Sequence, residues 1–315
     1  MIFKVPGLDN WTHYTHKILK PDSILANSFV ALSNYLRDIY PKPDWVIVFG
    51  DGNPTLSGAL AAARQNYKLV HVEAGEKREK YEHEEITRRV VDSLSDVFFC
   101  VSQRAVECLA ENSITENVYW TGDLAYDFMM KKARQLESKS FVEATNEYVL
   151  ASIHRPENLE AKVLINIITV LNEYSERVFF ICHPRTKYKL QQLGLWGKDN
   201  IHYLSSLSFS EVLSMITGAT FLFTDSGGLI REASHFGKRC IVRRNGGAWP
   251  ELINAGFNKR VGTKLNELRS AFAEMDLLST QNASPPESLF RKDGGIFALD
   301  VLCSLTKNLR QNWQS

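Results

Sequence analysis

The chain has 315 residues, of which 44% are hydrophobic and 23% are charged. These fractions are close to the globular average, which excludes disordered, collagen-like and miniature disulfide-rich proteins. Lysine and arginine (37 residues) nearly balance aspartate and glutamate (36 residues), so the net charge of +1 gives no overall field that would attract a polyanion. The length suits about two domains of ordinary size, each with its own core.

No uncharged apolar run reaches the roughly 18 residues that a membrane span requires. The N-terminal residues lack the pattern of an export signal, so we expect a cytoplasmic protein with no membrane partner. The five cysteines are scattered without the spacing of metal ligands. We therefore expect buried free thiols and no metal site.

Short apolar runs alternate with helical patterns along the chain. The first half predicts, in order, helix 24–40, strand 45–49, helix 56–65, strand 68–72, helix 84–94, strand 97–101, helix 103–111 and strand 118–120. A polar, charge-rich stretch at 129–146 predicts the domain break. The second half predicts strand 147–153, helix 161–174, strands 178–181 and 201–203, helix 210–216, strand 220–223, helix 229–236, strand 239–242 and a helical segment within 289–315.

Continuous apolar strands separated by helices are typical of parallel sheets that are covered on both faces. The sequence therefore predicts an α/β fold with two doubly wound, Rossmann-like parallel-sheet domains. We place the first domain at 1–138 and the second at 139–290. The remaining segment, 291–315, is expected to be a helix that crosses back onto another part of the chain.

Polar residues follow the predicted strands, at the edge where such sheets bind ligands. The strongest signal is Thr224-Asp-Ser-Gly-Gly228, which precedes a helical pattern. This turn could offer N–H groups and the positive helix end to a phosphate, with Ser226 adding a hydroxyl. Glu232, farther along the helix, could accept hydrogen bonds from ribose hydroxyls. An ordinary helix N-cap is the alternative explanation.

Three further groups of residues have both a functional and a structural explanation. Glu73 ends a buried strand, where a carboxylate must be paired, protonated or functional. Asp51, after Gly50, also suits a turn. Glu84 and Arg88 are four residues apart on one helix face, which is the ordinary spacing of a solvated salt bridge.

The remaining candidates are basic. His154 and Arg155 end a strand where they could meet a diphosphate, and the arginine could bind it in a bidentate way. His183, beside a proline, also suits a packing or turn position. The clusters Arg243-Arg244 and Lys77-Arg78-Glu-Lys80 could contact a phosphate backbone, but exposed charge is the ordinary explanation for them. Neither a GxGxxG fingerprint after the first strand nor a P-loop occurs, so no cofactor is indicated.

A set of motifs then follows in a distinctive order: His71-Val-Glu73-Ala-Gly75, Glu84-Glu85-x-x-Arg88, Thr121-Gly-Asp123, His154-Arg-Pro-Glu-Asn158, Thr224-Asp-Ser-Gly-Gly228 and Trp249-Pro-Glu251. Over residues 20–265 the chain thereby resembles the non-hydrolysing UDP-N-acetylglucosamine 2-epimerases. The resemblance implies the two-domain GT-B fold, with the sugar or acceptor on the N-terminal domain and UDP on the C-terminal one. It also implies a UDP-sugar as the ligand and leaves a homodimer open.

The resemblance also assigns roles to residues. It implies that Asp51, Glu73 and Glu84 are the acid/base carboxylates, that Arg88 supports them, and that His154 assists the departing UDP. The UDP-sugar is expected to contact Arg155, His183, Ser226, Gly227, Gly228, Glu232 and Glu251. The C2 proton of such a sugar is not next to a carbonyl, so inversion at C2 requires oxidation or elimination. With no nicotinamide site, elimination of UDP and its return remain.

The sequence also departs from the family. The first strand of the family and its Gly-Thr-Arg-Pro-Glu loop are not recognisable, so we expect a reduced N-terminal domain that lacks one phosphate anchor. Gly-Ala-Trp at 247–249 replaces the usual Thr-Glu-Arg. These departures keep two alternatives open. One is a GT-B glycosyltransferase that acts on a carbohydrate or a modified nucleic-acid hydroxyl, and the other is a sugar-nucleotide-binding protein without turnover.

Overall fold

The computed structural model describes residues 21–77, 83–136, 148–174, 177–197, 200–205, 207–246, 249–279, 284–285, 291 and 293–312. The chain divides into two compact units. Unit 1 comprises Met1–Trp120 and Asp300–Ser315, and unit 2 comprises Thr121–Leu299. The domain boundary that the sequence places at 138–139, and the role assigned to each domain, remain predictions.

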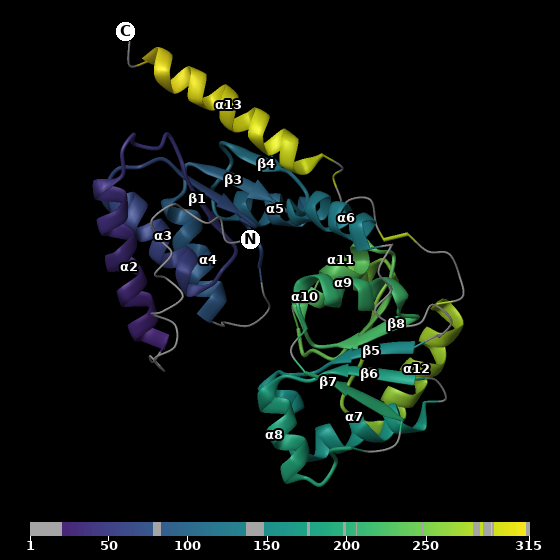
Figure 1. Ribbon diagram of the computed structural model, residues 1–315. Coiled ribbons are helices and arrows are strands. Elements are labelled where there is room, and N and C mark those ends of the chain that lie inside the picture. Colours follow the sequence, from purple (N-terminus) through teal and green to yellow (C-terminus); the bar gives the residue numbers. More distant parts are fainter. Residues whose placement is uncertain are drawn as a thin grey trace. The chain divides into compact units, whose positions relative to one another are not determined.

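Unit 1 contains a parallel sheet in the order β1-β2-β3-β4. Figure 1 labels β1, β3 and β4 of this sheet. Its strands are β1 (Val46–Phe49), β2 (Leu69–Val72), β3 (Val97–Cys100) and β4 (Val118–Trp120). The helices that precede and connect them are α2 (Pro21–Asp38), α3 (Asn53–Arg64), α4 (His83–Leu94) and α5 (Gln103–Glu111). The strand register pairs Val48 with His71 and His71 with Phe98. All four strands therefore end at the same edge of the sheet, where their following residues can gather.

The core of unit 1 explains why α3 is rich in small residues. Ala59, Ala61 and Ala62 are fully buried on this helix, in a cluster with Val48 and Leu69 of the sheet. Small side chains let the helix approach both the sheet and α2, which packs along it. This helix begins at Asn53, earlier than the sequence predicts, because a proline fits within a first helical turn.

Unit 2 contains a parallel sheet in the order β10-β9-β8-β5-β6-β7. Its strands are β5 (Tyr148–Ser152), β6 (Arg177–Ile181), β7 (Ile201–Leu204), β8 (Phe221–Thr224), β9 (Cys240–Val242) and β10 (Lys259–Arg260). The order reverses between the neighbours β5 and β8, where Ser152 pairs with Thr224. Such a switch point opens a crevice at the carboxyl ends of the two strands. The segments beginning at His154 and Asp225 start at this crevice.

Helices cover both faces of the second sheet (Figure 1). They are α6 (Ala125–Leu136), the 3-10 turn η1 (Pro156–Asn158), α7 (Ala161–Glu173), α8 (Pro184–Gln192), α9 (Phe209–Gly218), α10 (Gly227–His235), α11 (Pro250–Asn254) and α12 (Leu265–Ser279). Alternate residues of β5 enter two cores: Val149 packs with the layer of α7 and α12, and Leu150 packs with the layer of α9 and α10. A strand buried on both faces must be apolar throughout, which explains its sequence pattern.

The expected α/β class with two parallel sheets is confirmed. The sequence reading missed β10 and the helices α6, α8, α11 and α12. Part of the expected linker, from Met129 to Leu136, is helical, and Met129 is buried in the core of unit 2. The basic residues of α6 hide its apolar face, which is why it reads as a polar linker. Residues 137–147 lie outside the described residues.

The last helix, α13 (Gly294–Asn312), contains residues of both units, because the division falls between Leu299 and Asp300. Within unit 1, the indole Nε1 of Trp45 donates to Thr306 Oγ1 of this helix at 2.7 Å. The cysteines are free, and the expectation that they are buried is wrong for Cys303 on this helix, which is exposed. Across the described residues, no helix combines the length and apolar character needed to cross a bilayer.

Candidate active site

Arg88 joins two acidic groups in unit 1 that lie far apart in the sequence. Its Nη2 pairs with Asp51 Oδ2, and its Nη1 lies 3.4 Å from Glu85 Oε2. The residue is only 5% exposed, so the expected solvated pair with Glu84 is wrong. Glu84 lies half-buried on the same helix. Burial makes the Asp51 pair geometrically specific, because a buried guanidinium needs a fixed partner.

Glu73 adopts a backbone conformation that is rare for its residue type. Its φ of +68° lies in the left-handed region, and the nearby Gly50 has the same value. Residues other than glycine are held there only by surrounding structure, and such strain gathers at functional sites. A Cβ on Gly50 would lie 3.7 Å from Glu73 Oε2. The carboxylate of Glu73 therefore lies over Gly50, the residue directly before Asp51.

His71 of β2 and Asp92 of α4 hold this loop, and the sequence pattern assigned neither of them a role. The ring of His71 is fully buried, with Nδ1 2.6 Å from Asp92 Oδ1 and Nε2 3.0 Å from the carbonyl oxygen of Gly50. A carbonyl can only accept a hydrogen bond, so Nε2 carries a proton. Gly50 N–H in turn donates to Val72 O at 2.9 Å. In the sequence, the feature that could have pointed to His71 is a histidine within an otherwise apolar strand.

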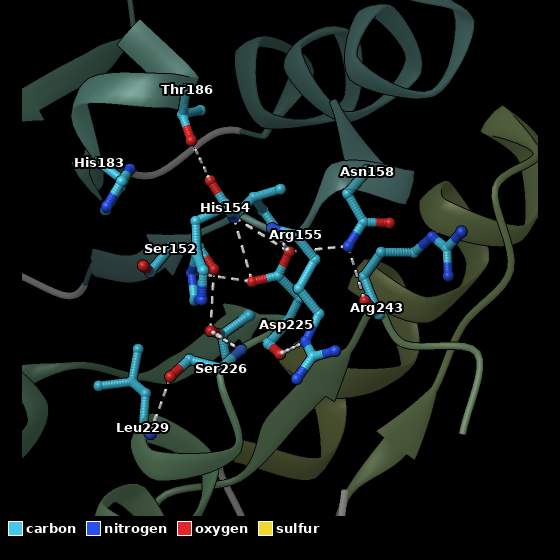
Figure 2. Close-up of polar contacts among 12 residues, drawn as sticks. Ser152, His154, Arg155, Asn158, His183, Thr186, Asp225, Ser226, Leu229 and Arg243 are labelled. Carbon is cyan, nitrogen blue, oxygen red and sulfur yellow. Dashed lines mark hydrogen bonds and ion pairs between the residues drawn. The ribbon is translucent and has the colours of Figure 1, made fainter. Parts of the chain in front are cut away.

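Asp225 is the centre of a hydrogen-bonded cluster in unit 2 (Figure 2). In the sequence it stood out only as one residue of the Thr224–Gly228 motif. Its buried carboxylate accepts from the backbone N–H groups of His154 at 3.0 Å and Arg155 at 2.9 Å, and from Asn158 Nδ2 at 2.8 Å. Arg155 Nε donates to the carbonyl of Asp225 at 3.2 Å. Asp225 therefore fixes the segment after β5 beside the end of β8.

The two histidines of this cluster differ in their surroundings. Burial lowers the pKa of His154, although its neighbour Asp225, 3.2 Å from Nδ1, acts to raise it. The positive charges of Arg155 and Arg185 also act to lower it. His183 is exposed, and its Nδ1 accepts from the backbone N–H of Arg185 at 3.2 Å, which caps α8. A contact of His183 with substrate stays a prediction.

The turn at the start of α10 is both a helix cap and a set of available donors. Ser226 Oγ accepts from the N–H of Leu229 at 3.4 Å, so the ordinary capping explanation is correct. Ser226 N–H donates to Thr224 Oγ1 at 3.1 Å. Gly227 and Gly228 are the first helical residues, whose N–H groups have no acceptor within the helix. Such groups, with the positive end of the helix dipole, favour an anion.

Three further residues belong to α10 or to the start of α11: Glu232 lies on α10, and Trp249 and Glu251 lie at the start of α11. Burial raises the pKa of Glu232 on α10, and the charge of Arg231 opposes the shift. Glu251 lies in the first turn of α11, directly after Trp249 and Pro250. Trp249 has a φ of +52°, and its Nε1 donates to the carbonyl of Gly227 at 2.9 Å. The tryptophan therefore braces the first residue of α10.

The basic clusters that the sequence offered as phosphate contacts differ in their burial. Arg243 and Arg244 are 2% and 5% exposed, so explaining this pair as exposed charge is wrong. They directly follow β9, the neighbour of β8 in the sheet. Lys77 is exposed and pairs with Glu111 at 2.9 Å. Residues 78–82 lie outside the described residues. Among the residues with described positions, no cluster of His, Cys, Asp and Glu suited to a metal ion occurs.

Residues 15–292 match the sequence model of the UDP-N-acetylglucosamine 2-epimerase family. The chain belongs to this family. A UDP-N-acetylglucosamine 2-epimerase homolog of Methanococcus maripaludis is 34% identical over 72% of this chain and 67% of its own length. The UDP-2,3-diacetamido-2,3-dideoxy-D-glucuronate 2-epimerase of Pseudomonas aeruginosa is 33% identical over 70% of this chain and 64% of its own. This family member thus spans about two thirds of the length of these relatives.

Solved structures agree with the assignment. The UDP-N-acetylglucosamine 2-epimerase of Methanocaldococcus jannaschii, in complex with UDP-GlcNAc and UDP, has a TM-score of 0.80 and 25% identity, covering 91% of this chain and 82% of that one. The enzyme of Neisseria meningitidis has a TM-score of 0.81 at 24% identity, covering 91% of this chain and 84% of that one, and supports the fold alone. The family resemblance and the GT-B-like fold are therefore confirmed.

Proposed function

We propose that this family member inverts C2 of a UDP-linked 2-acetamido sugar by eliminating UDP and adding it back. The observation that carries the proposal is the acid cluster of unit 1, in which Glu73 lies over Gly50 beside the pair of Asp51 with Arg88. Proton transfer at an unactivated carbon needs carboxylates held in place, and the left-handed φ of Glu73 is the kind of backbone strain that gathers at functional sites.

The reaction balances in two steps. A carboxylate removes the C2 proton, the electron pair of that bond forms a C1=C2 double bond, and the bond from C1 to the UDP oxygen breaks with its electrons leaving on UDP. In the second step a carboxylic acid gives a proton to C2 on the opposite face, and UDP oxygen bonds again to C1. We assign the proton transfers to Asp51, Glu73 and Glu84. Arg88 orients Asp51 through their ion pair.

Unit 2 is assigned the UDP. The turn formed by Ser226, Gly227 and Gly228 would hold the diphosphate, since two helix-start N–H groups and the helix dipole converge there. Asp225 holds the backbone of His154 and Arg155 beside the same turn, and we assign the side chains of these two residues to the leaving UDP. Glu232 would accept from the ribose hydroxyls, and Glu251 would lie near the sugar. The M. jannaschii relative, which holds UDP-GlcNAc and UDP, supports UDP as the ligand.

The nature of the sugar is tested together with the reaction. One relative acts on UDP-N-acetylglucosamine and another on a UDP-diacetamido-glucuronate, at nearly equal identity to this chain. Each sugar nucleotide is incubated with the protein in deuterated water and followed by proton NMR at C2. We expect loss of the C2 proton signal and appearance of the second epimer for one of the two sugars.

The same experiment separates the alternatives. UDP release that depends on an added acceptor, without exchange at C2, would indicate glycosyl transfer. Binding of the sugar nucleotide with neither exchange nor release, at high protein concentration, would indicate a protein without turnover. Either outcome would contradict the proposed epimerisation.

The lowered pKa of His154 leads to a pH prediction. Burial holds this pKa below the ordinary 6.5, so the free ring is neutral near pH 7. A bound diphosphate would favour the protonated ring, because opposite charges attract. UDP binding should therefore take up protons, and UDP affinity should rise as the pH falls from 8 to 6. Calorimetry in two buffers of different ionisation enthalpy measures the uptake.

The control for this prediction is His154→Asn. UDP itself titrates with a phosphate pKa of about 6, and that contribution remains in the variant. The difference in proton uptake between the two proteins therefore reports the histidine alone. Equal uptake by wild type and His154→Asn would mean that His154 does not face the diphosphate.

A further inference from the structure

Arg244 lies against the first residue of α10. It follows β9, which pairs with β8, so the segments after both strands leave from the same edge of the sheet. Its Nη1 lies 3.2 Å from the position that a Cβ on Gly227 would take. The side chain is nearly fully buried, in contrast to an ordinary surface arginine. Gly227 thus leaves the space that the guanidinium occupies.

The charges around this turn point to an anion. The first turn of α10 contains no acidic residue, and its N-terminus is the positive end of a helix dipole. Asp225, which directly precedes the turn, has a carboxylate that already accepts hydrogen bonds from the backbone N–H groups of His154 and Arg155. Arg244 adds a full positive charge at Gly227. A group with two phosphates is the chemistry that a planar guanidinium and helix-start N–H groups recognise together.

The preceding arginine serves the framework instead. The carbonyl of Arg243 accepts from Asn158 Nδ2 at 3.0 Å, and its Nη1 donates to Asn245 Oδ1 at 3.2 Å. In Figure 2 its guanidinium points away from Ser226. The two neighbours therefore share charge, burial and strand end, but only Arg244 lies at the α10 turn. Arg243 is a matched control for any test of Arg244.

We propose that Arg244 donates hydrogen bonds to the diphosphate of UDP at the Ser226–Gly228 turn and is a binding residue of this chain. The inference rests on the proposed function, since it takes UDP as the ligand of unit 2. The inference extends that function because it names a side chain that binds the phosphates of UDP and not the uridine or the sugar. The guanidinium stabilises UDP both as part of the substrate and as the leaving group, where negative charge develops.

The test compares UDP with uridine as ligands for wild type, Arg244→Gln and Arg243→Gln. The measured quantity is the ratio of the two dissociation constants, because a partial loss of folded protein changes both constants equally. UDP is titrated by calorimetry and uridine by ligand-observed NMR. For Arg244→Gln we expect UDP affinity to fall by about 10- to 100-fold, as for a lost charged hydrogen bond. Uridine affinity should not change, and Arg244→Lys should recover part of the loss.

Each outcome decides one of the claims. If Arg244→Gln keeps the wild-type ratio, or if Arg243→Gln changes the ratio as much, the inference about Arg244 is wrong while UDP binding by unit 2 stands. If wild type binds no UDP, the proposed function fails, and the inference fails with it. Arg244-specific weakening of UDP supports both.

Discussion

Replacing Glu73 by glutamine should slow deuterium exchange at C2 by about 10²- to 10⁴-fold, which is the usual contribution of a positioned acid or base. Glutamine has the size and shape of glutamate, but its amide cannot accept the C2 proton. UDP affinity should be unchanged, since Glu73 lies in unit 1 beside Gly50 and Asp51 and is not part of the α10 turn. Exchange is measured by NMR and UDP binding by calorimetry.

The control is Glu111→Gln, which removes an exposed carboxylate of the same unit that pairs with Lys77. It should leave exchange unaffected, because an exposed ion pair of this kind contributes little. Wild-type exchange in Glu73→Gln would remove the residue from the proton-transfer step. Weakened UDP binding in the same variant would instead show that the substitution disturbs more than the chemistry.

Replacing Asp225 by asparagine should have the second large effect, through structure rather than chemistry. The carboxylate accepts from the backbone of His154 and Arg155 and from the Asn158 amide. An asparagine has one acceptor oxygen and an NH₂ group that would face other donors. Buried donors left unpaired cost about 1 to 3 kcal/mol each. We expect a loss of about 3 kcal/mol in unfolding free energy and a large fall in UDP affinity.

Urea unfolding and UDP titration measure these two effects. Asp276→Asn is the comparison, because Asp276 also accepts a hydrogen bond, from the hydroxyl of Tyr174 at 2.6 Å, but at an exposed position. It should change neither quantity by much, since water replaces its partner there. Unchanged stability and UDP affinity in Asp225→Asn would show that the segment after β5 keeps its position without the carboxylate.

Much of the fold could be predicted from local pattern. The run Leu69-Val-His-Val72 is apolar because both faces of β2 are buried, and the sequence places it within one residue of its observed start. The Ser226 cap is equally local, since its partner Leu229 lies three residues away. Segments whose pattern is weak were missed: β10 consists of only Lys259 and Arg260, and the lysines and arginine of α6 mask its apolar face.

The candidate site was only partly predictable. The sequence pointed to Asp51, Glu73 and Arg88 as a group through resemblance, and the geometry joins Arg88 to Asp51 and sets Glu73 over Gly50. It did not single out His71 or Asp225 as the residues that hold the loops. Each of these residues forms hydrogen bonds to a segment that lies far away in the sequence. A histidine within a strand, or an aspartate directly after a strand, has many ordinary structural explanations.

The sequence by itself determined every strand except the two-residue β10, the helices with clear periodicity, the glycine turn and the family. The tertiary structure alone decided which charges are buried and paired: Arg88 with Asp51 rather than with Glu84, and Arg244 against Gly227 rather than in solvent. Local pattern reflects the backbone and the burial of neighbouring side chains, which a short window of residues contains. The partner of a charge depends on which strand ends meet at the edge of a sheet, and only the folded chain brings those ends together.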